Sequence, residues 1–115
     1  FVSLINLASV ADLGAAMGRT LDPRRFRGNL YLDGVAPWAE QAWPGRKLQI
    51  GETVLEVLKT IDRCPATGVD PTTGERDLDL VAALRRTYGH IDCGVYARVL
   101  VGGRIAAGDA ATIVD

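Results

Sequence analysis

Cys64 is the residue of this sequence whose type and setting are best suited to chemistry. It stands between Arg63 and Pro65, where an alternating apolar stretch, 54–61, gives way to the turn-rich stretch 67–74. A guanidinium beside a cysteine favours the thiolate, which is the form that attacks electrophiles and binds soft metals. The sequence therefore predicts that Cys64 is a metal ligand or a sulfur-transfer residue. The alternative is a small buried apolar residue, a common role of free cysteines.

A second group of polar residues lies upstream, in the stretch 22–29. It holds three arginines, among them Arg25 and Arg27, and ends in Asn29 at the entry to an apolar stretch. Guanidinium and amide groups donate the hydrogen bonds that hold a phosphate or another oxyanion. The stretch is therefore a candidate anion site, with a solvated basic turn as the alternative. None of the glycines forms a nucleotide-binding loop ahead of a helix, which disfavours a nucleotide-binding enzyme.

The composition argues against several classes of protein. The chain carries 13 basic and 14 acidic residues, a net charge of -1, which gives no support to nucleic-acid binding. No apolar run approaches the roughly twenty residues that a membrane span requires. We expect one domain, 1–115, without an internal boundary. We also expect it to lack the N-terminal part of a longer protein, because it begins at Phe1 within an apolar stretch.

Cysteine and histidine are scarce in this chain. Two cysteines, Cys64 and Cys93, and one histidine, His90, are too few for a structural zinc site or an iron–sulfur cluster. Cys93 is expected in the core, or as a resolving thiol if the fold brings it to Cys64. With no disulfide framework, we expect a reducing compartment, the cytoplasm.

Apolar periodicity predicts more strands than helices. A short helix is expected after Ser9, which resembles an N-cap, with Gly18 as its stop; a second follows Asp77 and Asp79 and ends at Gly89. Strands are expected at 29–34, 47–52, 54–61, 94–101, 104–107 and 110–114. The expected fold class is therefore mainly β with short helices, α+β, arranged as a small and mostly antiparallel barrel with two helices packed on it.

The two polar groups, in their order and spacing, resemble the MOSC domain, which is the C-terminal domain of molybdenum cofactor sulfurases. The matching motifs run in family order over nearly the whole chain, and the resemblance implies the β-barrel fold of that family. They are Ala8 with Ser9, 25–30, 38–40 with Trp43, 48–51, Arg63 with Cys64, 69–75, 94–97, and 103–105 with Gly108 and Asp109.

The resemblance implies a role for each candidate site residue. Cys64 occupies the position of the signature cysteine, which ligates molybdenum in the amidoxime-reducing branch of the family and is thought to carry sulfur elsewhere. The implied cofactor is the molybdenum cofactor, molybdopterin. Positions that contact it, including its phosphate, correspond to Arg27, Asn29, Asp62, Arg63 and Tyr96.

Two positions differ from the amidoxime-reducing branch. Gly28 stands where proline is usual, and Asp62 stands where some members have a small polar residue. A carboxylate beside a thiolate opposes its ionisation, so Asp62 is expected to offset part of the effect of Arg63.

Three functions remain open from the sequence. The first is a molybdenum-dependent oxidoreductase domain that reduces N-hydroxylated small molecules with electrons from an external donor. The second is a sulfur carrier in which Cys64 holds a persulfide received from a pyridoxal-phosphate cysteine desulfurase or molybdenum cofactor sulfurase. The family includes such fusions, although Lys47 and Lys59 lie in plain strand contexts that indicate no pyridoxal-phosphate site here. The third is a non-catalytic module that binds the cofactor or a partner protein.

Overall fold

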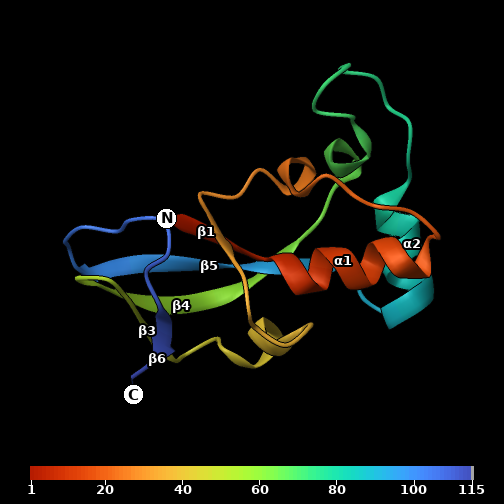
Figure 1. Cartoon of the computed structure of the whole chain (residues 1–115). Coiled ribbons are helices and arrows are strands. Elements are labelled where there is room, and N and C mark those ends of the chain that lie inside the picture. Colours follow the sequence, from red (N-terminus) through yellow and green to blue (C-terminus); the bar gives the residue numbers. More distant parts are fainter. Residues whose placement is uncertain (115) are drawn as a thin grey trace.

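The structure, a computed structural model, describes residues 1–114 as one curled sheet with two α-helices (Figure 1). The sheet has six strands in the order β2-β1-β5-β4-β3-β6 and forms a half-barrel. The strands are β1 (Val2–Asn6), β2 (Leu30–Leu32), β3 (Lys47–Ile50), β4 (Thr53–Asp62), β5 (Asp92–Val101) and β6 (Ala111–Ile113). The helices are α1 (Leu7–Ala16) and α2 (Leu80–Tyr88), with short 3₁₀ helices η1 (Pro23–Phe26), η2 (Ala39–Ala42) and η3 (Pro65–Gly68). The expected fold class, α+β with a β-rich body, is confirmed.

Strand pairing is antiparallel except between β1 and β2, which run parallel. The long pair β4 and β5 forms the middle of the sheet, and its register is irregular between Val57 and Lys59 and again between Thr60 and Asp62. Bulges of this kind bend a strand and increase its twist. The end of β4 thereby turns away from the sheet immediately before Cys64.

Two apolar clusters hold the fold together. One fills the inside of the curled sheet and includes Leu4, Leu55 and Val95. The other lies between the sheet, the two helices and η1, and includes Leu13 and Leu84. Figure 1 shows α1 and α2 side by side beyond the ends of the central strands, where this second cluster joins them. Within residues 1–114, neither α-helix is long and apolar enough to span a bilayer.

The first helix differs from the sequence-based expectation at its start. It begins at Leu7, and its N-cap is Asn6, whose side chain accepts a hydrogen bond from Ala8 N. Ser9 lies inside the helix, fully buried, and its hydroxyl donates to Glu40. The expected N-cap at Ser9 is therefore wrong, because its hydroxyl has a tertiary partner. The second helix agrees with expectation, since Asp79 caps it at Ala82 N.

The expected strand at 104–107 is absent from the structure. The backbone N–H and C=O of Arg104 both form hydrogen bonds with Glu52, which lies in the turn between β3 and β4. Glu52 N donates to Arg104 O, and Arg104 N donates to the Glu52 carboxylate. Ala106 N likewise donates to the Asp109 side chain. Because these groups bond to a turn and a side chain, the segment cannot use them to pair with a neighbouring strand.

Candidate functional site

A cavity of about 360 Å³ opens where β4 ends, between η1, η3 and β5. All but one of the predicted site residues line it, namely Cys64, Asp62, Arg63, Arg27 and Tyr96. They come from three separate parts of the chain, so only the fold brings them together. The missing residue is Asn29, which does not line this cavity.

The position of Cys64 follows from the end of β4. Arg63 N donates to Ile91 O, the last backbone hydrogen bond that ties this strand to the start of β5. Pro65 then begins η3, and Cys64 is the extended residue that caps it. A proline at the first helical position costs no helical hydrogen bond, and its fixed φ suits the start of η3. The side chain of Cys64 is exposed and therefore accessible to a ligand or a reagent.

Arg63 ties the walls of the cavity together. Its Nε donates to Cys93 O at 2.8 Å and its Nη1 to Phe26 O at 3.1 Å, while the guanidinium lies 5.2 Å from the centre of the Phe26 ring. The third nitrogen, Nη2, is buried and has no hydrogen-bond partner among the described residues. Burial lowers the pKa of this guanidinium. The positive charge of Arg63 is thus bound to neutral carbonyl groups alone, which suits a site that receives an anionic group.

Gly94 makes room for this arginine. Its φ is +85°, and a Cβ atom there would lie 2.9 Å from Leu4 O and 3.0 Å from Arg63 Nη2. Both the backbone conformation and the close approach require glycine. The placement of Arg63 therefore depends on a glycine in the neighbouring strand.

Arg27 and Asn29 have different surroundings although they are close in sequence. Arg27 is exposed, with φ +51°, and lines the Cys64 cavity. The Asn29 side-chain oxygen accepts hydrogen bonds from Ser3 N at 2.8 Å and Ser3 Oγ at 3.0 Å, and so fastens β1 to the segment entering β2. A contact between Asn29 and a cofactor stays a prediction, whereas Asn29 has a clear role in the fold.

The departure at Gly28 has a structural reason. A Cβ atom at this position would collide with the buried side chain of Ile5. Gly28 N also donates to the hydroxyl of Tyr31 at 3.0 Å, a hydrogen bond that proline cannot make. In this chain, therefore, glycine is the residue that the local packing accepts.

Tyr96 lines one side of the cavity, and Lys59 is its neighbour on β4. They are paired across β4 and β5, and Lys59 Nζ lies 5.8 Å from the centre of the Tyr96 ring. The Phe1 ring packs on the same tyrosine at 6.4 Å. Arg25, Arg27 and Arg63 line the cavity together with one acidic residue, Asp62, and Arg25 is paired with Asp77.

Cys93 is not placed to react with Cys64. It is fully buried, and burial raises the pKa of its thiol to about 12. The pairing of Asp62 with Asp92 places Cys93 near Ile61, three residues before Cys64, or roughly 10 Å away along the strand. Bridged cysteines have Cα atoms no more than about 7 Å apart. The structure therefore favours the core role for Cys93 over that of a resolving thiol.

Arg25 and Thr67 are among the residues at the cavity that were not singled out as site residues from the sequence. Both are buried. The basic stretch around Arg25 was recognisable, but nothing in the sequence separates its buried arginine from its exposed ones. Thr67 has no sequence signal beyond its place in a turn.

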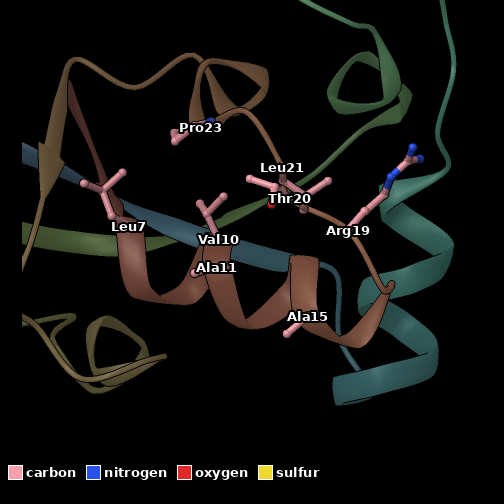
Figure 2. A pocket seen from close by; sticks show the side chains of 8 residues that line it. All are labelled: Leu7, Val10, Ala11, Ala15, Arg19, Thr20, Leu21 and Pro23. Atoms are coloured by element: carbon pink, nitrogen blue, oxygen red, sulfur yellow. The ribbon is translucent and has the colours of Figure 1, made fainter.

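No cluster of three or more His, Cys, Asp or Glu side chains suited to a metal ion occurs in the part of the chain that the structure describes. A metal at this cavity would therefore depend on Cys64 and on ligands that a cofactor brings. A second cavity, of about 380 Å³, runs along α1 and is lined by six apolar residues, Thr20 and Arg19 (Figure 2). None of the predicted site residues lies there, and it holds no nucleophile of the kind that Cys64 provides.

The chain is similar to molybdenum cofactor sulfurases and to mitochondrial amidoxime-reducing components. The sequence pattern that defines the MOSC domain matches residues 1–112. A molybdenum cofactor sulfurase of Caenorhabditis elegans is 35% identical over 99 residues, which cover 83% of this chain and 14% of that protein. Mitochondrial amidoxime-reducing component 1 of Homo sapiens is 34% identical over 71 residues, which cover 62% of this chain and 20% of that protein. The chain thus spans less than a quarter of the length of these curated relatives.

A solved structure has the same fold. The crystal structure of YiiM from Geobacillus stearothermophilus matches with a TM-score of 0.74 at 21% sequence identity, over 99% of this chain and 54% of that one. At this identity the match establishes the architecture, a half-barrel with helices at one end.

Proposed function

Since this chain belongs to the MOSC domain family, we propose that its Cys64 cavity binds the molybdenum cofactor and serves an oxidoreductase that reduces N-hydroxylated compounds. The observation that carries the proposal is the exposed thiol of Cys64, which opens into a cavity walled by Arg27 and Arg63. A thiolate is the soft ligand that suits molybdenum, and guanidinium groups suit a phosphate.

The residues present fit such a group on two further counts. Arg63 Nη2 is a buried donor without a partner among the described residues, and the other hydrogen bonds of this guanidinium go to the carbonyl oxygens of Cys93 and Phe26. Arg27 is exposed at the same cavity and free to turn toward a phosphate. In this proposal Cys64 holds the metal, while Arg27, Arg63 and Tyr96 hold the organic part of the cofactor.

When bound, the cofactor supplies two-electron chemistry that the side chains alone cannot perform. Reduction of an N-hydroxylated compound takes two electrons and two protons, breaks the N–O bond and releases water. The protein binds and orients the reactants. Because this chain has only two cysteines, the electrons are proposed to come from an external donor.

A sulfur carrier is the second candidate function. The sulfurase relative matches a larger share of this chain, 83%, than the amidoxime-reducing relative, 62%. In this case the Cys64 thiolate attacks the terminal sulfur of a persulfide on a cysteine desulfurase; an S–S bond forms on Cys64, the donor's S–S bond breaks, and the donor cysteine leaves as a thiolate. Pyridoxal phosphate would belong to that partner. Either function is proposed to operate in the cytoplasm, where Cys64 stays reduced.

Molybdenum content separates these functions. Full-length protein from a host that makes the cofactor is expected to hold about one molybdenum per chain, and Cys64→Ser is expected to lose it, because a hydroxyl is a poor soft-metal ligand. Cys93→Ala is the matched control, since this thiol is buried away from the cavity. Equal metal in wild type and Cys64→Ser would overturn the oxidoreductase proposal.

The carrier function has its own signature. If the protein holds no molybdenum but gains the mass of one sulfur atom after incubation with a cysteine desulfurase and cysteine, and Cys64→Ser does not, the carrier replaces the oxidoreductase. If neither result is obtained, the function that remains is a module that binds a partner without chemistry at Cys64.

A further inference from the structure

The turn that carries Cys64 is closed by one residue. Thr67 donates twice to the carbonyl oxygen of Cys64, from its backbone N at 3.1 Å and from its hydroxyl at 2.9 Å. Thr67 is buried, so its hydroxyl has little access to water as an alternative partner. These two hydrogen bonds fix the backbone from which the thiol projects.

Thr67 is in turn held by Arg25. The Arg25 guanidinium lies 3.5 Å from Thr67 O through Nη1 and forms a two-point ion pair with Asp77, at 2.9 and 2.8 Å. This chain of contacts links η1 to η3 across the cavity wall. It connects residues 52 positions apart, so it fixes the cavity and not merely a local turn.

The ion pair is a costly way to stabilise a fold. The Arg25 side chain is 7% exposed and its partner Asp77 is 39% exposed, so a buried cation faces a half-hydrated anion. Arg25 Nε is also buried without a partner among the described residues. Buried ion pairs often contribute less stability than apolar side chains of similar size, so stability alone is a poor reason for this arrangement.

The neighbouring arginine provides a contrast within the same element. Arg24 pairs with Asp22 at 2.7 Å, but its side chain is 63% exposed, and its further contact is with Thr72 in the exposed turn. Neither Arg24 nor Thr72 lines the Cys64 cavity. Two adjacent ion pairs of similar geometry therefore differ in whether they reach the turn that bears Cys64.

We propose that Thr67 and the Arg25–Asp77 ion pair are positioning residues for Cys64, which hold its thiol in register with the guanidinium groups of the cavity. The inference deepens the proposed function, because it concerns the same thiol, but it applies equally to a metal ligand and to a persulfide carrier. None of the three residues needs to touch the cofactor or a substrate.

The test compares two alkylating reagents on the full-length protein without cofactor. Iodoacetate is an anion and iodoacetamide is neutral, and both react with the same thiolate, so the ratio of their rates reports the local charge around the sulfur and not the thiolate fraction. Cys93 does not interfere, since it is fully buried with a pKa raised to about 12. Thr67→Val keeps size and charge but removes the hydroxyl that donates to Cys64 O, so that only the backbone N–H of residue 67 still donates to it. It is expected to lower the iodoacetate-to-iodoacetamide ratio by about twofold or more, as the thiol moves from the guanidinium groups.

Two controls distinguish positioning from general loosening. Thr67→Ser restores the hydroxyl and is expected to restore the ratio. Thr72→Val removes an exposed hydroxyl from the neighbouring contact and is expected to leave the ratio unchanged. An unchanged ratio in Thr67→Val, or a failure of Thr67→Ser to restore it, would overturn the inference.

A second measurement addresses the ion pair on the holoprotein. Asp77→Asn removes the charged partner of Arg25 and is expected to lower molybdenum retention about fivefold. Asp22→Asn makes the same change in the neighbouring Arg24–Asp22 ion pair and is expected to have no effect on retention. Equal retention in both variants would remove the ion pair from the proposal. If Cys64→Ser keeps its molybdenum while Thr67→Val still changes the alkylation ratio, the proposed function fails and the positioning inference stands.

Discussion

Ser9 donates its hydroxyl hydrogen bond to Glu40, whose two carboxylate oxygens lie 2.7 and 3.1 Å away in the protein interior. Asn6 Nδ2 donates to the same carboxylate, and the Ser9 oxygen accepts from Trp38 N. These contacts join the start of α1 to η2. Glu40 is almost fully buried, so the carboxylate depends on these donors in place of water.

Glu40→Ala is therefore expected to destabilise the domain by about 3 kcal/mol, since the buried Ser9 hydroxyl would lose its acceptor and Asn6 Nδ2 would keep only Ala36 O. Urea denaturation followed by circular dichroism measures the loss. Glu75→Ala, at an exposed turn, is expected to change the free energy of unfolding by less than about 0.5 kcal/mol. A similar result for both variants would mean that the network contributes nothing.

Gly94→Ala is expected to cost about 2–4 kcal/mol and to disturb the site. The added methyl group meets a positive φ, the Leu4 carbonyl and the Arg63 guanidinium together. Gly102→Ala is the control, because nothing lies within 4 Å of a Cβ atom there. Denaturation and molybdenum content are both measured. If Gly94→Ala loses stability but keeps its molybdenum, Gly94 is required for the fold and not for metal binding at the site.

The contact between Asp12 and Tyr88 predicts a pH dependence. The hydrogen bond from Tyr88, with a second from Trp38, lowers the pKa of Asp12 below its ordinary value of 3.8. A carboxylate with a lowered folded-state pKa stabilises the fold above its unfolded pKa and loses that contribution as the pH falls through the folded value. The stability advantage of wild type over Asp12→Asn is thus expected to be constant from pH 5 to 7 and to shrink below about pH 3.8. Urea denaturation across this range, with Glu75→Gln as the control, provides the check; a constant difference would contradict it.

Arg27→Ala is expected to weaken cofactor retention about tenfold to a hundredfold, the usual loss for a charge-assisted contact to phosphate. Arg24→Ala is the matched control, because Arg24 pairs with Asp22 outside the cavity. Dialysis followed by metal analysis measures the retained molybdenum. Equal losses in the two variants would indicate that the basic stretch acts only as a solvated turn.

The strand β4 and the helix α2 were predictable because their signals are local, whereas β1 was not expected and the strand expected at 104–107 is absent. The alternation of 54–61 and the pair of Asp79 and Gly89 require no knowledge of the rest of the chain, and the structure has β4 and α2 at those places. The N-cap expected at Ser9 was wrong because the partner of its side chain is distant in the sequence. A serine that caps a helix and a serine that meets a distant carboxylate look alike in sequence, and only the fold shows that its partner is Glu40.

The residues of the candidate site divide in the same way, into those with a signal in the sequence and those that only the fold brings to light. Cys64 and Arg63 were recognisable from their residue types, and the family pattern pointed to Arg27 and Tyr96. Thr67 was not recognisable, because its role depends on two hydrogen bonds to one carbonyl oxygen. The side-chain oxygen of Asn29 has a partner in Ser3 that no spacing rule anticipates.

The separation of the two cysteines also determines how Cys64 would withstand oxidation. Peroxide would oxidise the Cys64 thiolate to a sulfenic acid, which a nearby thiol can convert to a disulfide. Cys93 cannot act as that thiol, because it is buried and lies too far along the strand. Within this chain, recovery would require a small external thiol such as glutathione to enter the cavity. Without one, further oxidation would be irreversible, so a ligand or persulfide on the sulfur would also protect it.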